Sequence, residues 1–332
     1  MSSQAVGGSR HADLDQTDRR LRAAFGDRVG RQVPLGELTT FRTGGAAEWL
    51  VETPSPDDIV TAACLTRDLG MPLTVLGGGS NVLVGDGGVR GLVLRVRHGA
   101  IGRVDAHHVR ADSGVTINGL VRWTVRRGLG GLERWAGTPG TVGGGIRGNA
   151  HFDDQLLGDI VAAVGLVDRA GHVARVSAQD MGFDYDESRV QHTGELVLWA
   201  EFEVAAGAVT ELRAAARRSL AFRKRTQPLD RASAGCVFQN PRPDDGPLPD
   251  GVPRSAGALI DLAGLKGHRV GAAAVSPVHA NFIVNEGGAS ARDVRALIER
   301  CRASVRERFG LVLRDELMYL GEFEIEGGNE VG

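Results

Sequence analysis

Residues 73–84 read Leu-Thr-Val-Leu-Gly-Gly-Gly-Ser-Asn-Val-Leu-Val, a glycine-rich loop between two short apolar runs. The apolar runs, Leu73–Leu76 and Val82–Val84, predict strands. The loop between them, Gly77–Asn81, is called the first glycine loop below. Because it joins two strands, no helix dipole can serve an anion there. Any phosphate must therefore be bound by backbone N–H groups and by the side chains of Ser80 and Asn81.

Glycine is concentrated elsewhere in the same half of the chain. The protein has 48 glycines among 332 residues, about twice the usual share of roughly 7%. Two further clusters are Thr43-Gly44-Gly45 and the second glycine loop, residues 137–148. One cluster alone is typical of a tight turn, but three in one domain favour a site where the backbone closely approaches a phosphate or pyrophosphate.

The second glycine loop also contains a misleading motif. Gly143, Gly145 and Gly148 match the dinucleotide fingerprint G-x-G-x-x-G, and Asp168 lies 20 residues beyond Gly148. The context differs, because proline and glycines precede the motif instead of a strand, and residues 149–154 do not open an amphipathic helix. We therefore reject a Rossmann fold and a Walker A loop, and we expect Asp168 in a hairpin turn.

Composition excludes several functional classes. The chain has 39 basic and 41 acidic residues, 24% charged residues and 42% hydrophobic ones. Near-neutral charge argues against nucleic-acid binding, and no apolar run approaches the length of a membrane span. The polar N-terminus lacks a secretory signal. Cys64, Cys236 and Cys301 form no Cys-x-x-Cys pair, so we expect a cytoplasmic protein without a disulfide framework or a metal site.

Strands and helices alternate in both halves, which predicts an α/β or α+β fold. We expect strands at 92–96, 104–111 and 196–204, and a hairpin of 161–167 with 173–176. Helices are expected at 56–69, 117–127, 210–222 and 290–309, the last with a Ser290–Asp293 capping box. Residues 1–20 predict a disordered tail, and the domain boundary is expected near residues 206–207.

Six segments resemble one family, the UDP-N-acetylenolpyruvoylglucosamine reductases, also called UDP-N-acetylmuramate dehydrogenases, which make a peptidoglycan precursor. The resemblance runs from about Leu35 to Gly321. The matching segments are 39–45, 75–84, 137–144, 233–241 (SAGCVFQNP), 256–267 (AGALIDLAGLKG) and 276–285, with Glu316 following. The flavin-loop matches indicate the wider FAD superfamily, whereas the C-terminal segments are specific to this reductase.

The resemblance implies a two-subdomain FAD-binding domain of the PCMH/vanillyl-alcohol-oxidase type at 33–206. A C-terminal α+β substrate-binding domain follows at 207–322, and an acidic tail at 323–332. It also implies non-covalent FAD, NADPH as hydride donor, and a UDP-sugar whose enolpyruvyl group is reduced and then protonated. The expected FAD-binding residues are Arg42, Thr43, Gly44, Gly77, Gly78, Gly79, Ser80, Asn81, Gly137, Pro139, Gly140, Thr141, Gly143 and Gly144.

The same resemblance implies catalytic and substrate-binding residues. Cys236 occupies the position of the family's serine proton donor, and a thiol is a stronger acid than an alcohol. Glu316 matches the catalytic glutamate, expected to orient the enolpyruvyl carboxylate. Asn240 and Lys224 match substrate-contacting positions, and Lys224 could pair with the diphosphate; as part of a basic run it could equally be a solvated charge.

The chain departs from the family pattern at two places. Asp186 stands where the family has the arginine that stabilises the enolate, and we expect Arg189 to replace it, with Arg147 as the rival cation. His151 and Phe152 stand where the family usually has Gly-Ala-Tyr. Two alternatives stay open: a flavin oxidase of the same superfamily, and a non-catalytic paralogue that binds flavin or UDP-sugar. Ser80 disfavours the oxidase, because such oxidases often tether FAD through a loop histidine.

Overall fold

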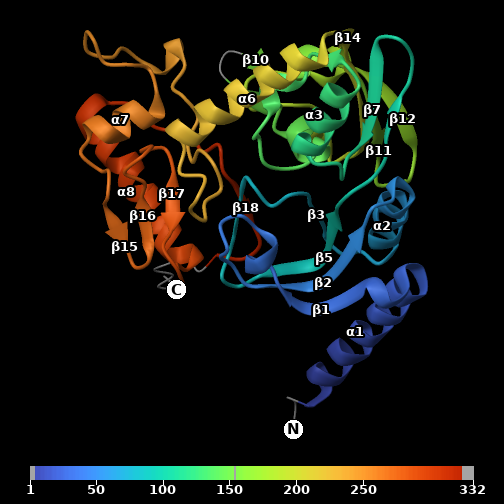
Figure 1. The fold of residues 1–332 in the computed structure, drawn as a ribbon. Helices are drawn as coiled ribbons and strands as arrows, with labels where there is room; N and C mark the ends of the chain where they lie inside the picture. The colour runs from blue at the N-terminus through green and yellow to red at the C-terminus, as the bar shows by residue number, and fades with distance from the viewer. Residues whose placement is uncertain (1–3, 153–154, 324–332) are drawn as a thin grey trace.

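The computed structural model describes residues 4–152 and 155–323, which form three regions (Figure 1). The first region is a sheet of order β1 (Val29–Pro34), β2 (Ala46–Thr53), β5 (Val89–Val96) and β3 (Leu73–Leu76). β1 is antiparallel to β2, whereas β2 and β3 are both parallel to β5. α2 (Pro56–Asp68) begins at Ser55, whose hydroxyl accepts a hydrogen bond from the Asp57 N–H, and buries Ile59 against the sheet.

The N-terminus corrects one expectation. Instead of a disordered tail over residues 1–20, the described chain forms helix α1 (Gln4–Phe25). Leu21 and Phe25 lie one helical turn apart, are fully buried, and pack with Trp49 and Ile59 in the core of the first region. The segment has few apolar residues, and such a composition is typical of a disordered tail. Leu21 and Phe25, however, lie on one face of the helix, and that face is buried.

The second region is an antiparallel sheet of order β12 (Val173–Ser177), β11 (Val161–Val167), β13 (Leu196–Glu203), β7 (His108–Asp112) and β6 (Ile101–Arg103). α3 (Ile117–Arg126) and α4 (Val142–Arg147) pack on it around Trp135 and Phe202. The predicted hairpin is confirmed: the Asp168 carboxylate accepts hydrogen bonds from the N–H groups of Ala170 and His172. The strands on either side of α4, β8 (Leu129–Gly130) and β9 (His151–Phe152), belong to two different two-stranded sheets, so they do not form the parallel strand–helix–strand unit of a Rossmann fold.

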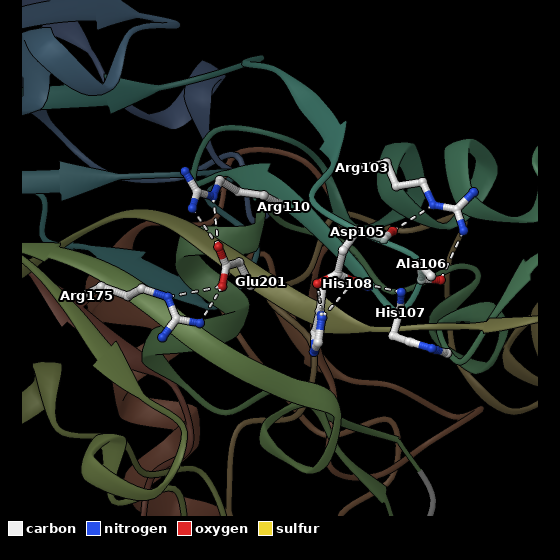
Figure 2. A network of polar contacts seen from close by, with 8 residues as sticks. All are labelled: Arg103, Asp105, Ala106, His107, His108, Arg110, Arg175 and Glu201. Carbon is white, nitrogen blue, oxygen red and sulfur yellow. Dashed lines mark hydrogen bonds and ion pairs between the residues drawn. The ribbon is translucent and has the colours of Figure 1, made fainter.

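The predicted strand 104–111 is wrong in its first half. The carboxylate of Asp105 accepts hydrogen bonds from the N–H groups of His107 and His108, at 2.7 and 2.9 Å. This Asx-type turn separates β6 from β7, and the Arg103 side chain closes it through the carbonyls of Asp105 and Ala106 (Figure 2).

The third region contains α7 (Ala256–Leu262), α8 (Ala291–Phe309) and the sheet β15 (Arg269–Val270), β16 (Ala273–Val275) and β17 (Ile283–Asn285). α6 (Val209–Thr226) runs from the second region toward the third (Figure 1). Smaller elements are α5 (Val190–Thr193) and the pairs β8 (Leu129–Gly130) with β14 (Ala205–Ala206) and β9 (His151–Phe152) with β10 (Gln155–Leu156). The whole is of the expected mixed α/β class.

The end of the described chain returns to the first region. β18 (Met318–Leu320) pairs in parallel with β4 (Val82–Val84), the strand that follows the first glycine loop. Glu316 is thereby brought to that loop from 235 residues away. The predicted acidic tail lies outside the described residues beyond Phe323. Among the described helices, none is long and apolar enough to cross a membrane.

Candidate active site

The two glycine loops pack directly against each other. A Cβ atom on Gly78 would lie 2.7 Å from the Cα of Gly140, and one on Gly77 would lie 2.4 Å from the Thr141 hydroxyl oxygen. Gly140 itself has a φ of 98°, which favours glycine. Glycine is therefore required here so that two backbones can approach.

The Thr43-Gly44-Gly45 segment and the residues before it complete the group. The Thr40 N–H donates to the Gly79 carbonyl at 2.9 Å, and a Cβ on Gly79 would lie 2.5 Å from the Leu38 carbonyl oxygen. Gly44 packs against Val84 at the end of β4. The structure thus brings together all three glycine clusters singled out in the sequence. Thr43 anchors its segment to the third region by donating its hydroxyl to the Ala289 carbonyl.

The paired loops have the donors that a dinucleotide cofactor needs. The N–H groups of Gly78 and Ser80 donate no hydrogen bond to any other described residue. In the second glycine loop, the Gly143 N–H donates to the Ser113 carbonyl. The buried hydroxyl of Ser113 has no hydrogen-bond partner among the described residues. Gly78, Pro139 and Gly144 are exposed. These features fit FAD, whose pyrophosphate can lie against unpaired backbone N–H groups.

Asn81 makes two hydrogen bonds to the segment around Glu316. Its side-chain amide donates to the Glu316 carbonyl at 3.0 Å, and its own carbonyl accepts from the Met318 N–H at 3.1 Å. Asn81 therefore ties the first glycine loop to the segment that carries Glu316.

Cys236 and Glu316 lie close together. The Glu316 N–H donates to the carbonyl of Val237, the residue after Cys236, at 2.8 Å. Burial raises the pKa of the Cys236 thiol well above its usual value, and the charges of Glu316 and Asp186 raise it further, against a hydrogen bond from Asn281 and the charge of Arg223. The thiol is therefore held protonated, the form that can donate a proton.

Two asparagines hold the Cys236 segment in place. The Asn281 side chain donates to the Phe238 carbonyl at 2.7 Å and accepts from the Phe238 N–H at 3.0 Å. The Asn240 side chain accepts from the Ala256 N–H at the start of α7. Asn240 also forms a backbone hydrogen bond with Tyr185, whose pKa is raised by burial and by Asp186. Asn240 therefore belongs to the same cluster.

Arg189 does not join this cluster, contrary to expectation. Its guanidinium donates to both carboxylate oxygens of Glu195, at 2.8 and 3.1 Å, and 38% of its side chain is exposed. α5 begins only at Val190, and residues 184–187 form a separate tight turn, so Asp186 and Arg189 do not share one helical turn. Arg147 contacts the segment that follows Glu316: it is partly buried, and its Nη1 is 3.3 Å from the sulfur of Met318.

Lys224 is exposed, whereas its neighbour Arg223 is buried. The Arg223 guanidinium donates to the Thr138 hydroxyl at 2.8 Å and stacks 3.8 Å from the centre of the Phe152 ring. Burial lowers the pKa of Arg223 to about 10, and its charge reaches Cys236. The sequence analysis missed Arg223. The available signal was its spacing four residues after Ser219, which shares the buried face of α6.

Two subdomains that meet at glycine loops, with a protonated thiol beside them, define a flavin-dependent oxidoreductase. In agreement, residues 47–177 match the FAD binding domain family, and residues 227–320 match the family "UDP-N-acetylenolpyruvoylglucosamine reductase, C-terminal domain". The chain belongs to the UDP-N-acetylenolpyruvoylglucosamine reductase family.

Individual relatives give the same result. The chain is 40% identical to UDP-N-acetylenolpyruvoylglucosamine reductase 2 of Symbiobacterium thermophilum, over 91% of this chain and 96% of the relative. It is 38% identical to the reductase of Anaeromyxobacter sp. strain Fw109-5, over 94% and 93%. The crystal structure of the Thermus caldophilus reductase superposes with a TM-score of 0.73 at 34% identity, covering 88% of this chain and 99% of that one.

Proposed function

We propose that this protein reduces UDP-N-acetylenolpyruvoylglucosamine to UDP-N-acetylmuramate, with bound FAD and with NADPH as hydride donor, as a cytoplasmic step of peptidoglycan precursor synthesis. The observation that carries the proposal is that Cys236 and Glu316 meet beside the paired glycine loops. Asn81 joins the first of these loops to the segment that carries Glu316. We assign FAD binding to residues 33–206 and UDP-sugar binding to residues 207–322. Neither nucleic acid nor a membrane is expected as a partner.

FAD, when bound between the glycine loops, would supply the hydride-transfer chemistry that links NADPH to the substrate double bond. The protein's part is to hold the cofactor and to supply the proton. In this proposal the backbone of Gly77–Ser80 and of Gly140–Thr141 holds the pyrophosphate. The side chain of Arg223, held against the second loop by Thr138, contributes positive charge there.

Cys236 supplies the proton that completes the reduction. Hydride addition to one carbon of the enolpyruvyl double bond leaves an enolate, and the Sγ–H proton passes to the other carbon, leaving a thiolate that water reprotonates. Glu316 orients the substrate carboxylate region. Since Arg189 is bound to Glu195, we assign the role of the nearby cation to Arg147, whose pKa is lowered by burial.

The test separates the two halves of the reaction. Flavin reduction by NADPH and flavin reoxidation by the enolpyruvyl UDP-sugar are followed by stopped-flow absorbance. Cys236→Ala is expected to leave the first rate unchanged and to slow the second by about 10²–10⁴-fold, and Cys236→Ser is expected to restore much of it. Equal slowing of both steps would make Cys236 a structural thiol. Oxygen-driven reoxidation without NADPH would favour the oxidase, and absence of any turnover would favour a flavin-binding paralogue.

A further inference from the structure

Three side chains from distant segments converge next to Cys236. His151 lies on β9, Asp186 on the turn of residues 184–187, and Glu316 just before β18. One potential ligand atom from each lies within 4.8 Å of the other two, and the Nδ1 atom of His151 is 3.1 Å from the Oδ1 atom of Asp186. His151 and Asp186 are also the two places where the chain departs from its family's pattern.

Asp186 is nearly buried and incompletely hydrogen-bonded. Its side chain is only 10% exposed, and its second carboxylate oxygen, Oδ2, is buried with no hydrogen-bond partner in the described part of the chain. A buried carboxylate oxygen without a partner is costly. The residue also has a φ of 56°, an uncommon backbone conformation that persists where surrounding contacts impose it.

The surrounding contacts hold this arrangement. The Asn149 side chain donates to the Asp184 carbonyl at 2.8 Å, which fixes the turn beside β9. Gln191 donates to the Asp186 carbonyl at 2.8 Å. The Tyr185 ring stacks on the imidazole of His151 with ring centres 4.7 Å apart. The ligand atoms therefore sit on a prearranged scaffold.

The charges in the cluster favour a cation. A carboxylate oxygen of Asp186 and one of Glu316 lie within 4.8 Å of each other, so two acidic groups share one small volume. Within the described residues, His151 is the only basic side chain that contacts either carboxylate. A divalent ion would cancel the charge of both carboxylates and leave the imidazole neutral.

We propose that His151, Asp186 and Glu316 bind a divalent transition-metal ion of the Zn²⁺, Mn²⁺ or Fe²⁺ class. One imidazole nitrogen and two carboxylates are a donor set that such ions accept, whereas Mg²⁺ and Ca²⁺ prefer oxygen alone. With metal–ligand bonds of about 2.1 Å, the 3.1 Å separation of Nδ1 and Oδ1 corresponds to an angle of about 95° at the metal.

Three protein ligands leave coordination positions open. A consequence that rests on the proposed function is that the ion would add its positive charge to that of Arg147 beside Cys236, where the enolate forms. Metal binding itself does not depend on the reaction, because it is measured on the resting protein without substrate.

The test is an Mn²⁺ titration of the chelator-treated, FAD-loaded protein, in which electron paramagnetic resonance measures unbound Mn²⁺. One Mn²⁺ per chain is expected, displaced by Zn²⁺. Asp186→Asn and His151→Ala should each weaken binding by about 10-fold or more, while the flavin spectrum shows that the variants are folded. The matched control is His172→Ala. It removes the surface pair of His172 and Asp168, whose Nδ1 and Oδ2 atoms are 3.0 Å apart, and it should leave the Mn²⁺ affinity unchanged.

Two results would overturn the proposal: wild-type protein that binds no Mn²⁺, or an Asp186→Asn variant that binds it as tightly as the wild type. The cluster would then be a His151–Asp186 hydrogen-bonded pair beside Glu316 that binds no metal ion. Failure of the Cys236 experiment, in contrast, would leave the metal result standing and contradict only the reductase assignment.

Discussion

Two glutamates, Glu201 and Glu316, show how neighbouring side chains decide the direction in which a carboxyl pKa shifts. Glu201 on β13 is 4% exposed and receives two hydrogen bonds from each of Arg110 and Arg175, at 2.6–3.2 Å (Figure 2). Burial opposes its ionisation, but the two arginines outweigh burial and its pKa is lowered. Glu316 has no such partners among the described side chains, and its pKa is raised.

Glu201→Gln is expected to lower the free energy of unfolding by about 1–3 kcal/mol at neutral pH, because it removes charge-assisted hydrogen bonds. A lowered folded pKa gives stability that is present above the unfolded pKa of about 4.3 and is lost as the pH falls through the folded pKa. The difference between variant and wild type in urea unfolding should therefore shrink below about pH 4. Glu203→Gln, at an exposed position of the same strand, serves as control and should stay within about 0.5 kcal/mol.

Gly78→Ala tests the contact between the glycine loops. Its φ is not positive, so the cost is steric: the new Cβ would lie 2.7 Å from the Gly140 backbone and push the loops apart. Weaker FAD retention on gel filtration is expected, with a smaller change in thermal stability of the apoprotein. Gly102→Ala, where a Cβ meets nothing within 4 Å, should retain FAD fully. Full retention by Gly78→Ala would show that the loops need not touch.

At the level of elements, a helix cap can be predicted from the sequence, whereas a helix that is held by tertiary burial is harder to predict. The Ser290–Asp293 capping box of α8 is confirmed: the Ser290 hydroxyl accepts from the Asp293 N–H at 3.0 Å, and the Asp293 carboxylate accepts from the Ser290 N–H at 3.1 Å. α1 is held by tertiary packing, because buried residues such as Leu21 and Phe25 lie against the core of the first region.

Ser290→Ala is expected to lower the free energy of unfolding by about 1 kcal/mol, since it leaves the Asp293 N–H without its acceptor. Ser255 offers a matched comparison, because it stands at the N-cap of α7 but its side chain makes no capping hydrogen bond. Ser255→Ala should therefore cost clearly less in chemical denaturation. Equal losses for both variants would mean that the hydroxyl of Ser290 contributes nothing specific.

At the scale of the whole molecule, the candidate site is assembled from all three regions. β4 and its glycine loop belong to the first, α4 and the second loop to the second, and Cys236 to the third, while β18 binds the third to the first. FAD bound between them should therefore stabilise the entire fold rather than one region.

The purified protein is expected to be yellow and to release intact FAD on denaturation, because Ser80 stands in the loop where a histidine could form a covalent link. Added FAD should raise the melting temperature, with a gain of about 2.7 kcal/mol when free FAD is 100 times its Kd. Absorbance of the supernatant after heat precipitation and a thermal scan measure both effects. A colourless protein that takes up no added FAD contradicts the flavoprotein assignment.

The sequence by itself determined the parts whose signals are local. Strands Leu73–Leu76 and Val82–Val84, the hairpin turn at Asp168 and the cap at Ser290 depend on neighbours within a few residues, so pattern and turn chemistry suffice. The family motifs likewise gave the positions of Cys236 and Glu316.

Only the tertiary structure decided which side chains meet. The Asn81 amide is bonded to the Glu316 carbonyl, Arg189 is paired with Glu195, and Arg223 instead of Lys224 is buried. The contact between His151 and Asp186, which are 35 positions apart, likewise depends on the tertiary structure. Glu195 is only six residues from Arg189, but the partners of Asn81 and Asp186 come from distant segments. The direction of a side chain depends on how its segment packs, because a shift of one residue on a helix or in a loop replaces one charged group by another.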